Sequence, residues 1–274
     1  MFNYNKLRKK HYRSSVSKLK KNTKIDISNW LKNPYTFLKA RLFIEISSII
    51  VYFLQFTKVS PNQVTSIYIF LGFISGLFLA SNNDILILIS LFLFVFKNVF
   101  DWSDGLLARI KKNTSNLGDV LDRWGSIVGY NSFIFGFGFY LYNDSQNVNF
   151  IIIVICIIFL KSVDLKDYVY HLAGYKIIKE QNIKNTLKLL NINKRSSYIG
   201  KNKKFEKFKY SILMLLDDNR SHTIDPIALL IFIDNFYKDL NFLPYIFYLI
   251  FLKNILFFLG GVYITYFKNH VFKK

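Results

Sequence analysis

Long apolar segments separated by basic loops are the feature that most limits how this chain can fold. A helix needs about 20 mostly apolar residues to cross the hydrocarbon core of a bilayer. Windows of this kind lie at residues 62–80, 85–108, 118–142, 147–163, 224–237 and 243–267, the fifth being short and interrupted by Pro226. The chain also has 37 Lys and Arg against 17 Asp and Glu, so its apolar and charged residues must be segregated. A single cysteine excludes an intrachain disulfide scaffold.

The distribution of Lys and Arg supports six spans. Basic residues fill residues 1–29, 109–112, 161–220 and 268–274, whereas residues 81–84 and 142–147 contain none, and the last opposite loop holds only Lys238. Basic loops stay on the cytosolic side of a membrane. We therefore predict an all-α integral membrane protein with six transmembrane helices and both ends cytosolic. Its parts are a basic arm (1–29), a membrane domain (30–267) with a basic cytosolic insertion at about 164–221, and a cytosolic tail (268–274).

Residues 30–56 combine aromatic and apolar side chains with the charges of Lys32, Lys39, Arg41 and Glu45. These charges interrupt every 20-residue window, and a span here would invert the loop-charge pattern. We expect an amphipathic helix in the headgroup plane ahead of the first span, with a seventh span as the alternative.

Three carboxylates lie where two predicted spans meet the cytosolic side. Asp101 and Asp104 are spaced i, i+3 on one helix face, and Asp122 follows a short loop, just inside the next predicted span. An ionisable residue within a span costs about 2.5–3.5 kcal/mol on insertion scales, so it marks a functional site unless something neutralises it. We expect the three carboxylates to converge at the cytosolic mouth.

Oxygen ligands without a nearby His or Cys favour hard cations, Mg²⁺ or Mn²⁺, which usually hold phosphates. Arg109 adds a bidentate phosphate donor. Gly105, Ala108 and Gly118 are small, which lets a ligand or a neighbouring backbone approach closely. The alternative is a buried Asp/Arg network that holds two helices together, although it would leave net negative charge in a low dielectric.

These residues resemble the signature of the CDP-alcohol phosphotransferase, or CDP-alcohol phosphatidyltransferase, family. The signature is D-x-x-D-G-x-x-A-R, eight residues, then G-x-x-x-D-x-x-x-D, and every fixed position from Asp101 to Asp122 matches it. The last position is Ser126 instead of aspartate. Pro61, Asn62 and Thr65 also resemble the family's P-N-x-x-T motif, and six spans after an interfacial helix is the family's architecture.

The resemblance implies an enzyme that transfers a phospho-alcohol group from a CDP-activated alcohol to an acceptor hydroxyl and releases CMP. It places the reaction in phospholipid or related phosphodiester biosynthesis, and it implies a homodimer. By resemblance, Asp101, Asp104 and Asp122 hold two divalent cations that clamp the pyrophosphate. The residues that would line the nucleotide pocket are Asn62, Thr65, Gly105, Ala108, Arg109 and Gly118.

Ser126 replaces the aspartate expected to bind metal and accept the proton of the attacking hydroxyl. Serine is a weak base near neutral pH, and loss of a positioned base typically costs 10²- to 10⁴-fold in rate. Asp119 shares a helix face with Asp122 and Ser126 and could supply that base, or it could be a solvated acid at a helix start. His171 and His222 are further alternatives.

Other functions remain as alternatives. A non-catalytic homologue would bind the CDP-alcohol or a partner. A transporter is less consistent with carboxylates that all lie at one mouth of the membrane domain. Nucleic-acid binding by the arm is less consistent with the sequence, because binding to anionic lipid already accounts for its basic charge. The donor and acceptor, lipid or soluble, are left open. Abundant Ile, Lys, Asn, Phe and Tyr indicate an AT-rich genome, so we expect a bacterial inner membrane.

Overall fold

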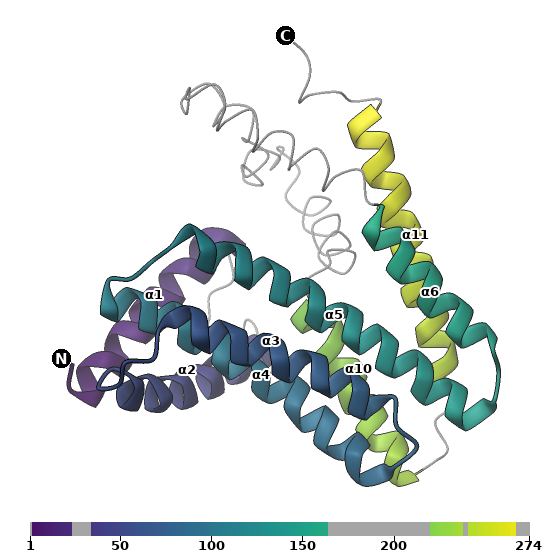
Figure 1. The fold of residues 1–274 in the computed structure, drawn as a ribbon, viewed down its shortest axis with the longest axis horizontal. Helices are drawn as coiled ribbons and strands as arrows, with labels where there is room; N and C mark the ends of the chain where they lie inside the picture. The colour runs from purple at the N-terminus through teal and green to yellow at the C-terminus, as the bar shows by residue number, and fades with distance from the viewer. Residues whose placement is uncertain (1, 24–33, 164–219, 238–240, 267–274) are drawn as a thin grey trace. The chain divides into compact units, whose positions relative to one another are not determined.

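The computed structural model is all helical in the part of the chain that it describes, which is residues 2–23, 34–163, 220–237 and 241–266. The insertion expected at 164–221, with His171, lies almost entirely outside these residues, and His222 falls in the first turn of the helix after it. The helices are α1 (Tyr4–Thr23), α2 (Pro34–Leu54), α3 (Pro61–Leu79), α4 (Asp84–Lys111), α5 (Asn116–Ser145), α6 (Asn149–Ser162), α10 (Arg220–Tyr237) and α11 (Leu243–Tyr266) (Figure 1).

The chain divides into two compact units, each described here by itself. The first comprises residues 1–140 and 224–236, and therefore contains α1 to α4, most of α5 and most of α10. The second comprises residues 141–223 and 237–274, in which α6 packs beside α11 through the ring of Phe150 against those of Phe247 and Tyr248. All residues of the candidate site belong to the first unit.

Each expected span coincides with a helix, namely α3, α4, α5, α6, α10 or α11. Three of the described helices are long and apolar enough to cross a membrane: Pro61–Leu79, Asp84–Lys111 and Leu243–Tyr263. The helix Asn149–Ser162 is apolar but shorter. Helix α2 falls within the segment expected to be interfacial. The described part of the protein is thus all-α with three candidate membrane spans, while six spans and an interfacial helix stay predictions.

Glycines let α3 and α5 approach each other closely. The Cα of Gly129 lies 3.4 Å from the position that a Cβ on Gly72 would occupy. A Cβ on Gly76 would lie 2.6 Å from the Cβ of Ser132, closer than real atoms allow. Between membrane helices, small residues four apart permit this kind of backbone contact. The packing brings α5 against α3, whose first two turns contain Asn62 and Thr65.

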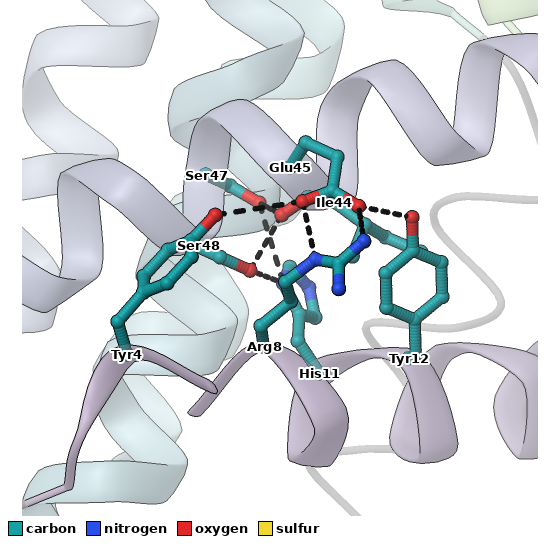
Figure 2. Close-up of polar contacts among 8 residues, drawn as sticks. All are labelled: Tyr4, Arg8, His11, Tyr12, Ile44, Glu45, Ser47 and Ser48. Carbon is teal, nitrogen blue, oxygen red and sulfur yellow. Dashed lines mark hydrogen bonds and ion pairs between the residues drawn. The ribbon is translucent and has the colours of Figure 1, made fainter. Parts of the chain in front are cut away.

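Helix α1 is docked on the rest of its unit. Its residues belong to the basic arm, whose sequence does not predict a helix. Leu7 is completely buried in a cluster with Val51 of α2, Val64 of α3 and Leu107 of α4. The phenol of Tyr12 and the guanidinium of Arg8 both hydrogen-bond Glu45 of α2, at 2.6 Å for Tyr12 (Figure 2). These hydrogen bonds, that of Arg8 above all, hold the pKa of Glu45 below its usual value.

His11 is a buried polar residue of this interface, and its nearest polar partners are also buried. Its Nδ1 lies 3.2 Å from the Ser48 Oγ and 3.3 Å from the Ser47 Oγ (Figure 2). Both hydroxyls donate to backbone carbonyls of α2, so their oxygens are free to accept a hydrogen bond from a neutral imidazole. Burial and the positive charge of Arg109 lower the pKa of His11 to about 4. His11 is therefore neutral near pH 7.

Candidate functional site

The acidic residues of the site come from the last turns of α4 and the first turns of α5. Asp101 lies close enough to Asp104 and Asp122 for direct electrostatic interaction, and its carboxyl group is within hydrogen-bonding reach of Asp122. Asp101 and Asp104 are partly buried, whereas Asp122 is exposed. Like charges this close require a counter-charge or a shared proton. The charge of the three carboxyl groups would therefore favour a cation nearby.

Thr65 connects α3 to this cluster. Its Oγ1 donates a hydrogen bond of 2.6 Å to the Asp104 Oδ2, and the side chain is buried. The start of α3 is set by a capping box in which Ser60 and Gln63 exchange hydrogen bonds, with Pro61 in the first turn. This local geometry places Thr65 one turn into the helix, where it reaches α4.

The predicted nucleotide-binding residues lie around the same end of α4. The Arg109 Nη1 would be 3.4 Å from a Cβ on Gly105, and Arg109 interacts electrostatically with Asp104. The Asn62 Oδ1 would be 3.1 Å from a Cβ on Gly118, so each glycine leaves room beside a polar side chain. Arg109 is exposed, as a group that binds an incoming anion should be.

The end of α4 is fixed by backbone and side-chain contacts to its neighbours. Lys112 adopts a left-handed conformation, with φ of 52°, and the Ala108 carbonyl accepts hydrogen bonds from the backbone of Lys112 and Asn113. The Lys111 Nζ donates to the carbonyls of Thr57 and Val59, both at 2.7 Å. Ala108 thus contributes its backbone to the turn that presents Arg109.

Ser126 and Asp119 lie in different surroundings. The Tyr68 hydroxyl of α3 lies 3.3 Å from two acceptors, the Ser126 Oγ and the Asp122 carbonyl oxygen. Its ring packs on Gly125, where a Cβ would be 2.7 Å from the ring edge. Asp119 is exposed in the first turn of α5. Asp119 is therefore placed at a helix start, where the helix dipole favours an acid.

Two residues of the site were not assigned by sequence reasoning. Tyr68 looks like one more aromatic of an apolar span, and its neighbours Ser126 and Gly125 are more than 50 residues away in the chain. Lys97 is a charged residue within the predicted span 85–108, but the sequence alone names no partner for it. It is buried and acts electrostatically on Asp101.

The carboxylates fit a hard divalent cation by their chemistry but do not form a closed coordination set. In the part of the chain that the structure describes, no group of three or more His, Cys, Asp or Glu is arranged to hold a metal ion. Asp104 is instead hydrogen-bonded to Thr65. By their chemistry alone, oxygen ligands of this kind suit Mg²⁺ or Mn²⁺.

The fold and site define a class of helical membrane proteins that gather carboxylates and one arginine at the end of a spanning helix. The model of the CDP-alcohol phosphatidyltransferase family matches residues 58–217 of the chain. The chain belongs to this family, a family of transferases that act in phospholipid synthesis and generally use divalent metals. No curated protein matches it. Its apolar helices and its family together indicate an integral membrane protein.

Proposed function

We propose that the protein transfers a phospho-alcohol group from a CDP-activated alcohol to an acceptor hydroxyl, with release of CMP. The observation that carries this proposal is the gathering of Asp101, Asp104 and Asp122 beside Arg109, in a chain of this family. We further propose a bacterial inner membrane, a cytosolic site, cytosolic termini and a homodimer.

In this proposal, Asp101, Asp104 and Asp122 would hold Mg²⁺ or Mn²⁺, which supplies charge stabilisation to the attacking and leaving oxygens of the pyrophosphate. Arg109 binds the phosphate that leaves with CMP, because its guanidinium is exposed and always charged. Asn62 and Thr65 line the nucleotide side of the site, and Gly105, Ala108 and Gly118 leave space for the ligand.

The chemical step forms a bond between the acceptor oxygen and the phosphorus that bears the alcohol. The bond from that phosphorus to the bridging oxygen breaks, and the electron pair leaves with CMP. The acceptor hydroxyl must lose its proton, and we propose Asp119 as the acceptor of that proton. Ser126 occupies the fourth position of the motif and accepts a hydrogen bond from Tyr68. In this proposal its hydroxyl orients the bound substrates and does not act as a base.

Purified protein should release CMP from at least one member of a panel of CDP-diacylglycerol, CDP-ethanolamine, CDP-choline and CDP-glycerol, when candidate acceptors and Mg²⁺ or Mn²⁺ are present. Asp101→Asn and Asp122→Asn should each abolish metal-dependent CDP binding, measured by isothermal titration, because each removes an anionic ligand from a hard-cation site. Unchanged CDP affinity in both variants would contradict the proposal at its centre.

The second candidate function is a non-catalytic homologue that binds the CDP-alcohol or a partner. Ser126 favours it, since the residue holds a hydrogen bond from Tyr68 where the family motif has an acid. Asp119→Asn separates the two functions. For an enzyme it should lower the rate by about 10²-fold or more with little effect on CDP binding. If instead only Ser126→Asp releases CMP, and the unmodified protein does not, the non-catalytic function holds.

A further inference from the structure

Lys97 is a buried cation near the middle of a membrane-spanning helix. It lies in α4, one turn before Asp101, and only 4% of its surface is exposed. A lysine within a span is costly unless it has a partner, and such residues mark functional sites. Lys97 also acts electrostatically on Asp101, so its charge belongs to the acidic cluster.

Two glycines from different helices make the slot that holds the Lys97 side chain. A Cβ on Gly72 of α3 would lie 3.4 Å from the Lys97 Cδ and 3.6 Å from its Nζ. A Cβ on Gly129 of α5 would collide with the Nζ itself. The slot exists because neither position has a side chain. The Lys97 side chain of α4 therefore lies against the backbones of α3 and α5, in space that a side chain at either glycine would fill.

Aromatic rings connect the ammonium group to the altered position of the motif. The Lys97 Nζ lies 5.6 Å from the centre of the Tyr68 ring and 5.9 Å from that of Phe94, within the range of cation–π attraction. The Tyr68 hydroxyl in turn lies 3.3 Å from the Ser126 Oγ. One residue, Tyr68, thus contacts both the buried positive charge and the position where the family motif has its fourth aspartate.

The formal charges of the cluster are consistent with this link. A motif with four aspartates carries a charge of −4, which two divalent cations balance. Here Asp101, Asp104 and Asp122 contribute −3, and Lys97 adds +1, which leaves −2 and is balanced by one divalent cation. Arg109 is left out of this sum because the proposed function assigns its charge to the donor phosphate.

We propose that Lys97 takes the electrostatic place of one metal ion, so that this protein binds a single divalent cation where four aspartates would bind two. Lys97 is a positioning residue in this proposal. Its charge holds the Asp101 carboxylate in place, and the carboxylates of the cluster then bind one cation. The inference rests on the proposed function, because it assumes that the acidic cluster binds metal.

The test is the number of Mn²⁺ ions bound per chain, measured by electron paramagnetic resonance on purified protein with saturating CDP. The unmodified protein should bind one ion. Ser126→Asp should still bind one, since Lys97 would pair with the new carboxylate. The double variant Lys97→Met/Ser126→Asp should bind two. Lys58→Met, at an exposed lysine ahead of α3, is the matched control and should bind one.

Each other result is decisive. Two ions on the unmodified protein or on Ser126→Asp, or one ion on a folded double variant, would overturn the role of Lys97 and leave the proposed function standing. If the double variant does not fold, Lys97→Gln/Ser126→Asp takes its place, with the same expected count and the same result that would overturn the inference. If no variant binds Mn²⁺ in the presence of CDP, the proposed function fails together with the inference.

Discussion

Thr65 is the side chain through which α3 reaches the acidic cluster. Its hydrogen bond to Asp104 is short and goes to a carboxylate, the kind of hydrogen bond that contributes about 1.5–3 kcal/mol. The hydrogen bond occupies Oδ2, one of the two Asp104 oxygens that could bind a metal ion. Thr65 should therefore set the orientation of Asp104 and, through it, the affinity of the site for a nucleotide with its metal.

We predict that Thr65→Val weakens metal-dependent CDP binding by about 10- to 100-fold, which corresponds to the loss of one hydrogen bond to a charged group. Thr65→Ser keeps the hydroxyl and is the matched control, with affinity close to that of the unmodified protein. Isothermal titration of CDP with Mn²⁺ measures both. Equal affinities for the two variants would mean that Asp104 is oriented by other contacts.

The residues that sequence reasoning found are those whose partners are close in the chain. Asp101 and Asp104 share a helix face because of their spacing, and a short loop returns Asp122 to the same end. Tyr68 and Lys97 escaped assignment because their contacts join α3, α4 and α5, and no local pattern encodes those contacts. Glycines in spans are common, so Gly72 and Gly129 carried no separate signal.

At the scale of elements, α1 shows why a basic segment was not recognised as a packed helix. Most of its described residues are polar, and its burial depends on a few positions, Leu7 and His11 above all. Hydropathy therefore indicates a solvated arm, whereas the partners that bury these residues lie in α2, α3 and α4. The positions of the apolar helices, by contrast, follow directly from hydropathy, because length and composition decide them.

We predict that the docking of α1 weakens as pH falls from about 6.5 to 4. The pKa of His11 is about 4 in the folded protein and 6.5 in the unfolded chain, so the unfolded chain binds the proton more readily between these values. Stability is full above pH 6.5 and declines below it, by about 3 kcal/mol at most. The measurement is the thermal unfolding midpoint between pH 7.5 and 4.5.

Two variants test which side chain causes this pH dependence of stability. His11→Gln should flatten the decline between pH 6.5 and 5, because it removes the group that takes up the proton. Glu45→Gln should change the profile only at lower pH, since the pKa of Glu45 is already below its usual value and the stability it adds is lost as pH falls through that pKa. An unchanged profile in His11→Gln would show that the imidazole does not control docking.

The contact between α3 and α5 carries a second prediction at this scale. Gly76→Ala should lower the unfolding midpoint, because the new methyl group would overlap Ser132, and overpacking typically costs about 1–3 kcal/mol. Gly260→Ala is the matched control on α11, where nothing lies within 4 Å of the new atom. Its midpoint should stay the same or rise, since alanine favours a helix. Equal effects would mean that α3 and α5 do not pack as described.

At the scale of the whole molecule, large apolar side chains stay exposed along the spanning helices. On α3 they include Ile67, Phe70, Phe73 and Leu77, which recur at three- or four-residue spacing on one side. A contiguous apolar face of this kind is normally covered, and lipid is the covering that suits a helix of span length. The buried and exposed faces of α3 therefore correspond to protein and bilayer.

The last prediction concerns which ends of the helices lie on which side of the membrane. Helix α4 has the length and composition of a span, so Asn82 before it and Asn113 after it should lie on opposite sides. If α5 crosses as well, Asp144 near its end should share the side of Asn82. Because basic loops stay on the cytosolic side, we predict that the loop with Lys111 and Lys112, and with it Asn113, faces the cytosol. In a Cys156→Ser background, cysteines at positions 82 and 144 should react with an impermeant maleimide on intact cells. A cysteine at position 113 should react only after the cells are opened, and its labelling from outside would invert the topology and place the acidic cluster on the opposite face.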